Sequence, residues 1–218
     1  MNRIHFLLIC FCLRIIAVNG QEEQFFKSGD LLFQDLNCGE LCDAIEAVTY
    51  GVQGRDFSHC GMIVEWNDSL MVLEAIGTAV QINSIEHFLE RSGDVMHIRN
   101  SVLGRVKEEY LEVTKKAVRR ALSMIGEPYD PEFLIDNGKW YCSELIYECF
   151  LDANNEEPFF DLAPMTFKDP MSKIFFPAWI EYYKELNESI PEGEPGINPG
   201  SLSRSDKLEI IDLENLKK

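Results

Sequence analysis

One cysteine of the sequence lies where a helix start would make it reactive. Cys142 begins the segment 142–151, in which Leu145, Ile146 and Cys149 recur at helical spacing. At a helix N-terminus, unpaired backbone N–H groups and the helix dipole favour an anion, which lowers the pKa of a thiol and raises its nucleophilic fraction. A neighbouring imidazole would complete an activated cysteine–histidine pair. The alternative interpretation is a buried cysteine that packs as a small hydrophobe.

His59 lies at the start of a predicted β-hairpin. The runs 60–66 and 70–76 are rich in residues that favour strands, and Asn67-Asp68 between them is typical of a two-residue turn. A histidine that enters a strand is more often structural than catalytic. Its role therefore depends on which side chains the hairpin places beside it.

The hairpin register brings an acid close to this histidine. With a two-residue turn, Gly61 lies opposite Glu74, and His59 is on the same face, one diagonal away. Glu74 could then accept a hydrogen bond from one imidazole nitrogen while the other nitrogen faces Cys142, which is the logic of a catalytic triad. A register shift of one residue would break this arrangement and leave Glu74 as a solvent-facing acid.

The same residue types offer two other uses. Cys38, Cys42, His59 and Cys60 are ligand types that zinc prefers, although the adjacency of the last two makes a shared metal awkward. A disulfide between Cys38 and Cys42 is also permitted by their spacing but not required by it. No P-loop, GxGxxG, HExxH or GxSxG motif is present in the sequence. We therefore predict neither a metal nor a cofactor.

The N-terminus is typical of a secretory signal peptide. Arg3 precedes an almost entirely apolar run at 4–13, and Val18-Asn19-Gly20 supplies small or permissive residues before a cut near Gln21. We therefore predict that residues 1–20 direct export to the periplasm or the extracellular space. Their removal takes away two of the seven cysteines and two positive charges, so that five cysteines remain and the net charge of −17 becomes −19. An odd number leaves at least one thiol unpaired within the chain.

The remaining elements indicate an α+β fold with a mainly antiparallel sheet, because strands and helices alternate in mixed order. Residues 191–218 contain alternating Pro and Gly at their start, which predicts a wrapped or partly flexible C-terminal segment of a single domain at 21–218. The other predicted strands are 29–34, 79–82 and 94–99, and the predicted helices are 40–49, 84–91 with Ser84 as its cap, 105–125, 142–151 and 179–186.

Composition restricts the partners. The 37 acidic residues against 20 basic ones exclude nucleic acid as a favoured partner, since phosphate binding needs clustered Lys and Arg. The apolar run at the N-terminus is too short for a stable membrane span. The acidity also argues against polyanionic substrates and favours neutral or amine-bearing ones. The oligomeric state is not determined by the sequence.

Several motifs together resemble a known family. GDLLF, FSHCGMIV, VLEAI, GEPYD and WYCSELIYECF are similar to the permuted papain-like amidases of the NlpC/P60 superfamily, in the YiiX/YebB-like branch, over about residues 27–210. The resemblance implies a circularly permuted papain-like fold with an antiparallel sheet packed against helices. It implies Cys142 as nucleophile, His59 as base and Glu74 as the orienting residue of a cysteine amidase or peptidase, with small peptides or cell-wall peptides as candidate substrates.

In the mechanism that these roles imply, the Cys142 thiolate attacks an amide or ester carbonyl, whose oxygen becomes an oxyanion. The Cys142 backbone N–H helps to hold that oxyanion, and a second hydrogen-bond donor is needed. Tyr129 and Tyr141 are candidates for that donor, and Asp130 is a candidate for binding a substrate amine. Alternatives on the same fold are an acyltransferase, a lipid-ester hydrolase, and a binding module without turnover. A lipid enzyme should have an exposed apolar lip, for which the pairs Phe159-Phe160 and Phe175-Phe176 are candidates.

Overall fold

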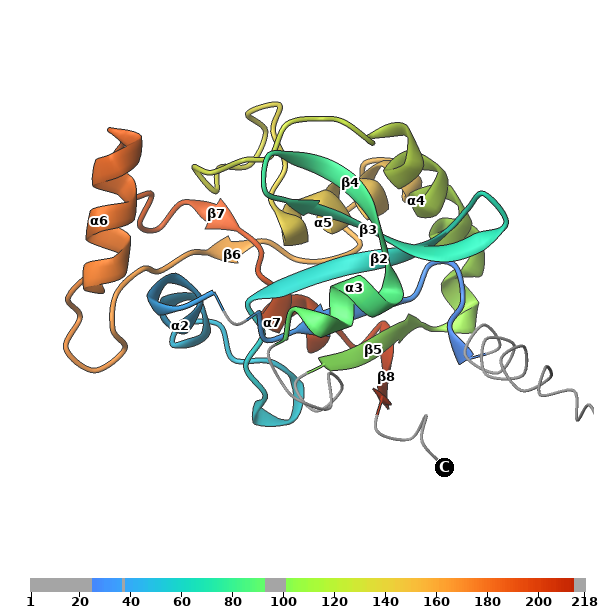
Figure 1. Cartoon of the computed structure of the whole chain (residues 1–218), viewed down its shortest axis with the longest axis horizontal. Helices are drawn as coiled ribbons and strands as arrows, with labels where there is room; N and C mark the ends of the chain where they lie inside the picture. The colour runs from blue at the N-terminus through green and yellow to red at the C-terminus, as the bar shows by residue number, and fades with distance from the viewer. Residues whose placement is uncertain (1–24, 37, 93–100, 214–218) are drawn as a thin grey trace, which may run out of the picture.

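A six-stranded sheet in the order β4-β3-β2-β1-β5-β8 forms the centre of the molecule (Figure 1). The computed structural model describes residues 25–36, 38–92 and 101–213, so the predicted signal peptide at 1–20 and the predicted strand at 94–99 lie outside it. Every neighbouring pair of strands is antiparallel, which confirms the predicted α+β class. The strands are β1 Leu31–Gln34, β2 His59–Trp66, β3 Ser69–Ile76, β4 Ala79–Ser84, β5 Ser101–Val106 and β8 Leu208–Asp212.

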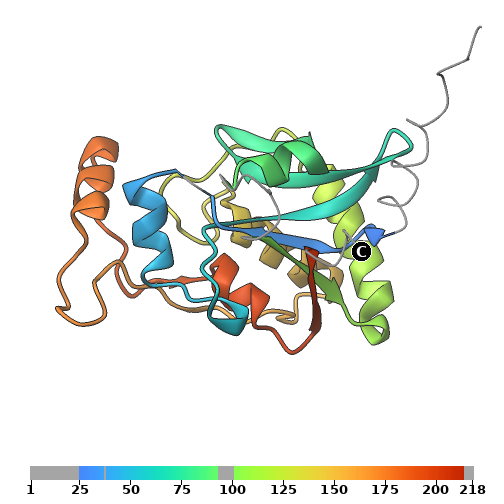
Figure 2. The ribbon, with the colours of Figure 1, turned by 60° about the horizontal axis from the view of Figure 1, so that its bottom comes forward.

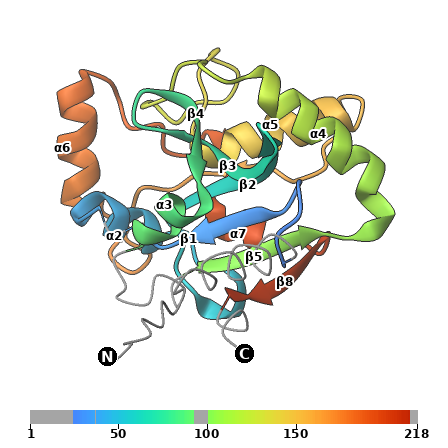
Figure 3. The ribbon, with the colours of Figure 1, turned by 45° about the vertical axis from the view of Figure 1, so that its right-hand side comes forward.

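Helices cover both faces of this sheet. Figure 3 shows α3 in front of the strands and α5 behind them, with α4 beside α5. A small second sheet of β6 and β7 lies next to the pair formed by α2 and α6 (Figure 2). The helices are α2 Glu40–Glu46, α3 Ile85–Glu90, α4 Leu111–Ser123, α5 Cys142–Ala153, α6 Pro177–Leu186 and α7 Pro199–Ser203, and the short strands are β6 Ala163–Pro164 and β7 Pro195–Gly196.

The sheet separates two hydrophobic cores because its strands alternate their side chains. Cys60, Met62 and Val64 of β2 point to the core that contains α4 and α5. Ile63 points to the opposite core, where Phe88 of α3 lies. Helix α5 is buried along nearly its whole length, which explains why its sequence is apolar on most sides. Cys142 at its first turn is therefore held rigidly against β2.

The hairpin of β2 and β3 has the predicted register. Trp66 lies opposite Ser69, and both turn residues have positive φ, 50° at Asn67 and 62° at Asp68, as a two-residue hairpin turn of this kind requires. Gly61 allows the close approach of the neighbouring elements, since a Cβ there would lie 2.5 Å from the side chain of Val72. The acid and the histidine of the hairpin are therefore placed on one face.

The predicted helix at 105–125 is wrong at its start. Residues 101–106 form β5, which pairs with both β1 and β8, and α4 begins only at Leu111. Arg105 remains extended because it lies opposite Glu209 of β8 and donates to both carboxylate oxygens of Asp30 at 2.9 and 2.7 Å. Pairing with strands distant in the sequence thus overrides the local helical pattern at these residues.

Two other features complete the framework. A disulfide joins Cys38 to Cys42 at the start of α2. The segment after residue 190 contains β7 and α7 and ends in β8, which extends the main sheet beside β5. In the part of the chain that the structure describes, no helix is long and apolar enough to cross a membrane.

Candidate active site

Cys142 lies at the N-terminus of α5 and faces the start of β2. Its side chain is buried and interacts electrostatically with the side chains of both His59 and Cys60. The helix start is fixed by the preceding loop, since the Trp140 N–H donates to the Pro128 carbonyl at 3.0 Å and the Asp130 N–H donates to the Trp140 carbonyl at 3.1 Å. The structure therefore brings the predicted cysteine and histidine together.

The surroundings of Cys142 favour its thiolate. The hydrogen bond with Cys60 is the largest influence, and together with the positive charge of the His59 ring it holds the pKa of Cys142 well below that of an ordinary thiol, although burial acts in the opposite direction. Burial raises the pKa of Cys60 well above its usual value, so Cys60 stays protonated and can donate to the neighbouring sulfur. Cys60 is thus a candidate for a functional residue that lowers the pKa of Cys142.

Glu74 bonds His59 as the hairpin register predicts. The Nε2 atom of His59 lies 2.5 Å from Oε2 of Glu74, and both side chains are buried. This contact leaves Nδ1 as the ring nitrogen for Cys142. The ring also packs on Phe88, at 5.6 Å between ring centroids. The imidazole is therefore fixed at one edge and on one face.

The imidazole is held in its charged form. Burial alone would lower the pKa of His59, but the charges and hydrogen bonds of Cys142 and Glu74 raise it to about 9. Burial likewise opposes ionisation of Glu74, yet the hydrogen bond and charge of His59, assisted by Arg91, lower the pKa of that carboxyl. The three shifts together favour a thiolate, an imidazolium and a carboxylate in the site.

Two further residues fix Glu74, and the sequence did not indicate either of them. The Nδ2 group of Asn83 donates to Oε1 at 2.8 Å, and Nη2 of Arg91 donates to both carboxylate oxygens at 2.7 and 2.6 Å. Asn83 could have been found from the β3–β4 register, which places it one diagonal from Glu74. Arg91 follows α3, and no local pattern signals its contact.

The candidate residues for binding an oxyanion or an amine differ in whether they have a free hydrogen-bonding group. The Tyr141 hydroxyl accepts a hydrogen bond from the Ile197 N–H at 3.2 Å, so its own proton is free to donate. Burial raises the pKa of Tyr129, and the charge of Cys142 raises it further, so this phenol also keeps its proton. Asp130 is fully buried and accepts from the backbone N–H groups of Glu132 and Leu134 at 2.9 and 2.7 Å. Both of its oxygens are thus committed to shaping the loop.

The C-terminal segment forms one wall of the site. Ile197 donates through its N–H to Tyr141 and accepts through its carbonyl from the Ser143 hydroxyl at 2.9 Å, so the two neighbours of Cys142 both bind it. More than fifty residues separate these partners along the chain. No spacing in the sequence could have indicated this contact.

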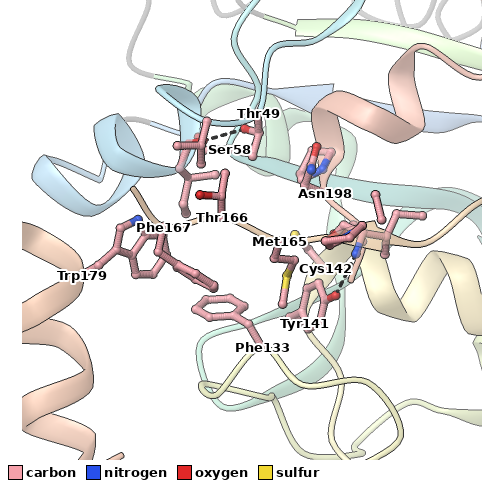
Figure 4. Close-up of a pocket in the computed structure, with 17 residues that line it drawn as sticks. Thr49, Ser58, Phe133, Tyr141, Cys142, Met165, Thr166, Phe167, Trp179 and Asn198 are labelled. Carbon is pink, nitrogen blue, oxygen red and sulfur yellow. Dashed lines mark hydrogen bonds between the residues drawn. The ribbon is translucent and has the colours of Figure 1, made fainter. Parts of the chain in front are cut away.

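A pocket opens beside Cys142 (Figure 4). It has a volume of about 120 Å³ and extends from the start of α5 toward α6. Figure 4 shows Tyr141 and Met165 near Cys142, with Phe133, Phe167 and Trp179 farther along. The pocket provides room for part of a substrate next to the sulfur.

The predicted zinc alternative is wrong, and so is one of the two candidate pairs for an exposed lip. Cys38 and Cys42 are joined in a disulfide and so cannot serve as zinc thiolates. Phe159 and Phe160 are buried and pack on Phe150, so this pair cannot be an exposed lip. Among the described residues, no group of three or more His, Cys, Asp or Glu side chains could hold a metal ion.

Comparisons with known proteins identify the family and support the fold. Residues 26–212 match the family described as permuted papain-like amidase enzyme, YaeF/YiiX, C92 family. The uncharacterized protein YiiX of Escherichia coli is 27% identical over 127 residues, which are 58% of this chain and 58% of that protein. The chain thus matches over less than two thirds of that relative's length. A solved structure described as metalloprotein yiiX from Escherichia coli superposes with a TM-score of 0.69, covering 85% of this chain and 96% of that one at 24% identity. That likeness supports the fold.

Proposed function

The chain belongs to the family of permuted papain-like amidases, and from that premise we propose that it is an exported thiol hydrolase that cleaves an amide through Cys142, His59 and Glu74. The observation that carries the proposal is the series of interactions from Cys142 through His59 to Glu74, in which Glu74 is itself fixed by Arg91. Nucleophile, base and orienting acid in such contact are the arrangement that acyl transfer requires.

The first half of the reaction forms an acyl-enzyme. The Cys142 thiolate attacks the carbonyl carbon of the amide, and the carbonyl electrons move to oxygen, where the Cys142 N–H and a Tyr129 or Tyr141 hydroxyl hold the developing charge. His59 then gives its proton to the nitrogen as the carbon–nitrogen bond breaks. The amine leaves, and a thioester to Cys142 remains.

The second half restores the enzyme. Water attacks the thioester carbonyl while His59 takes a proton from it, and the carbon–sulfur bond breaks to release the carboxylic acid. Glu74 keeps the ring oriented and stabilises its charge throughout. A peptide or cell-wall peptide amide is the substrate class that we propose. An alcohol or amine in place of water would make the same site an acyltransferase.

Export is a separate part of the proposal. The residues at 1–20 have the composition of a signal peptide, and a disulfide such as Cys38–Cys42 persists mainly in oxidising compartments. Expression of the full chain with a periplasmic fraction assay and N-terminal sequencing tests this part. An uncleaved N-terminus in the cytoplasmic fraction would contradict it.

The catalytic assignment is tested by cleavage of an amide library monitored by mass spectrometry. Cys142→Ala should abolish cleavage and the acyl adduct, whereas Cys149→Ala, which removes a buried thiol of the same helix, should leave both. Glu74→Gln should lower the rate by about 10²- to 10⁴-fold, and Glu65→Gln, an exposed acid on the same hairpin, should not. Undiminished cleavage by Cys142→Ala would refute the proposal, and adduct formation without turnover would indicate a binding module.

A further inference from the structure

Apart from the sulfur of Cys142 itself, the pocket beside Cys142 has no charged side chain in its lining. Its lining of 17 residues contains no Asp, Glu, Lys or Arg, in a chain of which 26% of residues are charged. The lining therefore differs sharply from the average of the molecule. A substrate group that carries a charge would lose its hydration there without gaining an ionic partner.

The polar side chains of the lining are also occupied by partners within the protein. Five of them donate to or accept from a backbone or side-chain atom at 2.7–3.1 Å, namely Thr49, Ser58, Ser143, Thr166 and Asn198. The Tyr141 hydroxyl accepts from the Ile197 N–H at 3.2 Å and keeps its proton as a neutral donor. The indole N–H of Trp179 is buried without a hydrogen-bond partner and adds one neutral donor. What the pocket presents is consequently mostly carbon.

Aromatic rings lead from the sulfur into the pocket. Tyr141, next to Cys142 in the chain, lies 5.5 Å from Phe133 between ring centroids, and Phe133 lies 5.8 Å from Trp179. Trp179 in turn lies 4.9 Å from Phe167. Edge contacts of this kind form a rigid apolar surface. A group bonded to Cys142 can extend along it.

We propose that this pocket binds the acyl part of the substrate and selects acyl groups with an uncharged, apolar body of about six carbon atoms. The inference rests on the proposed function, because the acyl group must first become bonded to Cys142. The size follows from the volume of about 120 Å³, which is slightly smaller than the roughly 150 Å³ of an apolar cavity that binds benzene. The amine that leaves lies outside this pocket and is not selected by it.

Three activated esters separate this assignment from its alternatives. The p-nitrophenyl esters of acetic, hexanoic and 6-aminohexanoic acid react in the same way: sulfur bonds to the acyl carbon, and p-nitrophenolate leaves with the electron pair of the broken carbon–oxygen bond. The release of p-nitrophenolate gives the rate of acylation, and intact mass spectrometry with Cys142→Ala identifies the site. Each rate is divided by that of the same ester with free cysteine, which removes differences in intrinsic reactivity.

Hexanoate should acylate Cys142 roughly ten- to a hundredfold faster than acetate, since each buried methylene contributes up to about fourfold. It should also exceed 6-aminohexanoate, which has the same chain with a terminal ammonium, by roughly tenfold or more. The net charge of −17 would by itself favour the ammonium ester, so the two influences predict opposite orders. Equal rates, or a preference for the ammonium ester, would overturn the pocket assignment while leaving the proposed function in place.

A pair of methionine variants locates the preference. Met165→Glu places a carboxylate in the lining and should reduce the preference for hexanoate over acetate to less than about threefold. Met171→Glu makes the same change at a side chain that is 91% exposed and outside the lining, and the preference should persist. Retention of the preference by folded Met165→Glu would contradict the assignment. Absence of acylation by all three esters in the wild-type protein would refute the proposed function and this inference with it.

Discussion

Cys60 places a second thiol beside Cys142, the proposed nucleophile. Cys60 follows His59 in the chain, and side chains alternate between the two faces of β2. Cys60 therefore points toward α5, whereas His59, the first residue of the strand, packs on Phe88 at the other face. The Cys60 thiol is the main influence that lowers the pKa of Cys142. The reactivity of Cys142 should thus depend on a residue outside the proposed triad.

Replacing Cys60 should change the pH at which Cys142 becomes reactive. Without the donor, Cys60→Ala should raise the pKa of Cys142, so the acid limb of its alkylation by iodoacetamide should move to higher pH by about one unit. Cys60→Ser retains a donor and should move the limb less. Peptide mass spectrometry of Cys142 after timed alkylation measures both profiles, and identical profiles for Cys60→Ala and wild type would contradict the role.

Glu144 is a buried acid on the first turn of α5. Its oxygens accept from the N–H groups of Tyr141 at 3.4 Å and of Asp136 at 3.3 Å. Burial nevertheless raises its pKa, which the charge of Asp130 also raises, to about 8. The carboxyl therefore keeps its proton in the folded protein at a pH where the unfolded chain has lost it.

This proton predicts how stability depends on pH. Because the pKa of Glu144 is raised on folding, its contribution to stability is fully present at a pH below its unfolded pKa near 4.5. The contribution, on the order of 2–4 kcal/mol in the free energy of unfolding, is lost as the pH rises toward 8. In Glu144→Gln the loss between pH 5 and 8 should be smaller by several degrees in Tm. Glu65→Gln, at an exposed site, serves as the control. Parallel Tm curves for Glu144→Gln and wild type would exclude this explanation.

At the scale of single elements, α3 lies between its cap at Ser84 and the contact of Arg91 with Glu74. Ser84 caps the helix by accepting from the His87 N–H at 3.0 Å. Phe88 within the helix packs on His59, and Arg91 at its end bonds Glu74. The position of the acid therefore depends on a helix of six residues that cannot be stable alone.

Removal of the cap should destabilise this helix. Ser84→Ala should lower the free energy of unfolding by about 1 kcal/mol, which corresponds to roughly 2–4 °C in Tm, whereas Ser84→Asp should retain most of the stability because Asp also caps well. Thermal unfolding followed by circular dichroism measures both. Equal losses in the two variants would show that the hydroxyl does not act as a cap.

At the scale of the whole molecule, β8 and Leu213, the residue after it, contribute to both cores. Leu208 lies in the core that contains α5, and Leu213 lies in the core on the other face of the sheet. Arg55, which follows the 3-10 turn at 52–54, forms an ion pair with Asp212. The last described strand thus ties the C-terminal segment, which also borders Cys142, to the main sheet.

Shortening these leucines should therefore cost stability independently. Leu208→Ala and Leu213→Ala should each lower the free energy of unfolding by about 2–4 kcal/mol, and the double variant should lose nearly the sum, since the sites lie on opposite faces. Glu209→Ala, at an exposed position between them, should change stability by less than about 1 kcal/mol. Urea unfolding measures all four variants, and losses below 1 kcal/mol for both leucines would contradict this role of β8.

The sequence alone predicted what local rules control. The Asn67-Asp68 turn determined the hairpin register, and that register placed His59 beside Glu74, because turn length and the two-residue period of a strand leave little freedom. Helical spacing identified α5 with Cys142 at its start. These predictions depended only on neighbours along the chain.

Tertiary structure decided everything that depends on distant pairing. Residues 105 and 106 became strand rather than helix because β1 and β8 lie close to β5. The support of Glu74 by Arg91, the bonds of Ile197 to both neighbours of Cys142, and the uncharged pocket arise where segments far apart in the sequence meet. The spacing of residues along the sequence cannot indicate such contacts, because their free energy comes from burial and hydrogen bonding that exist only in the packed molecule.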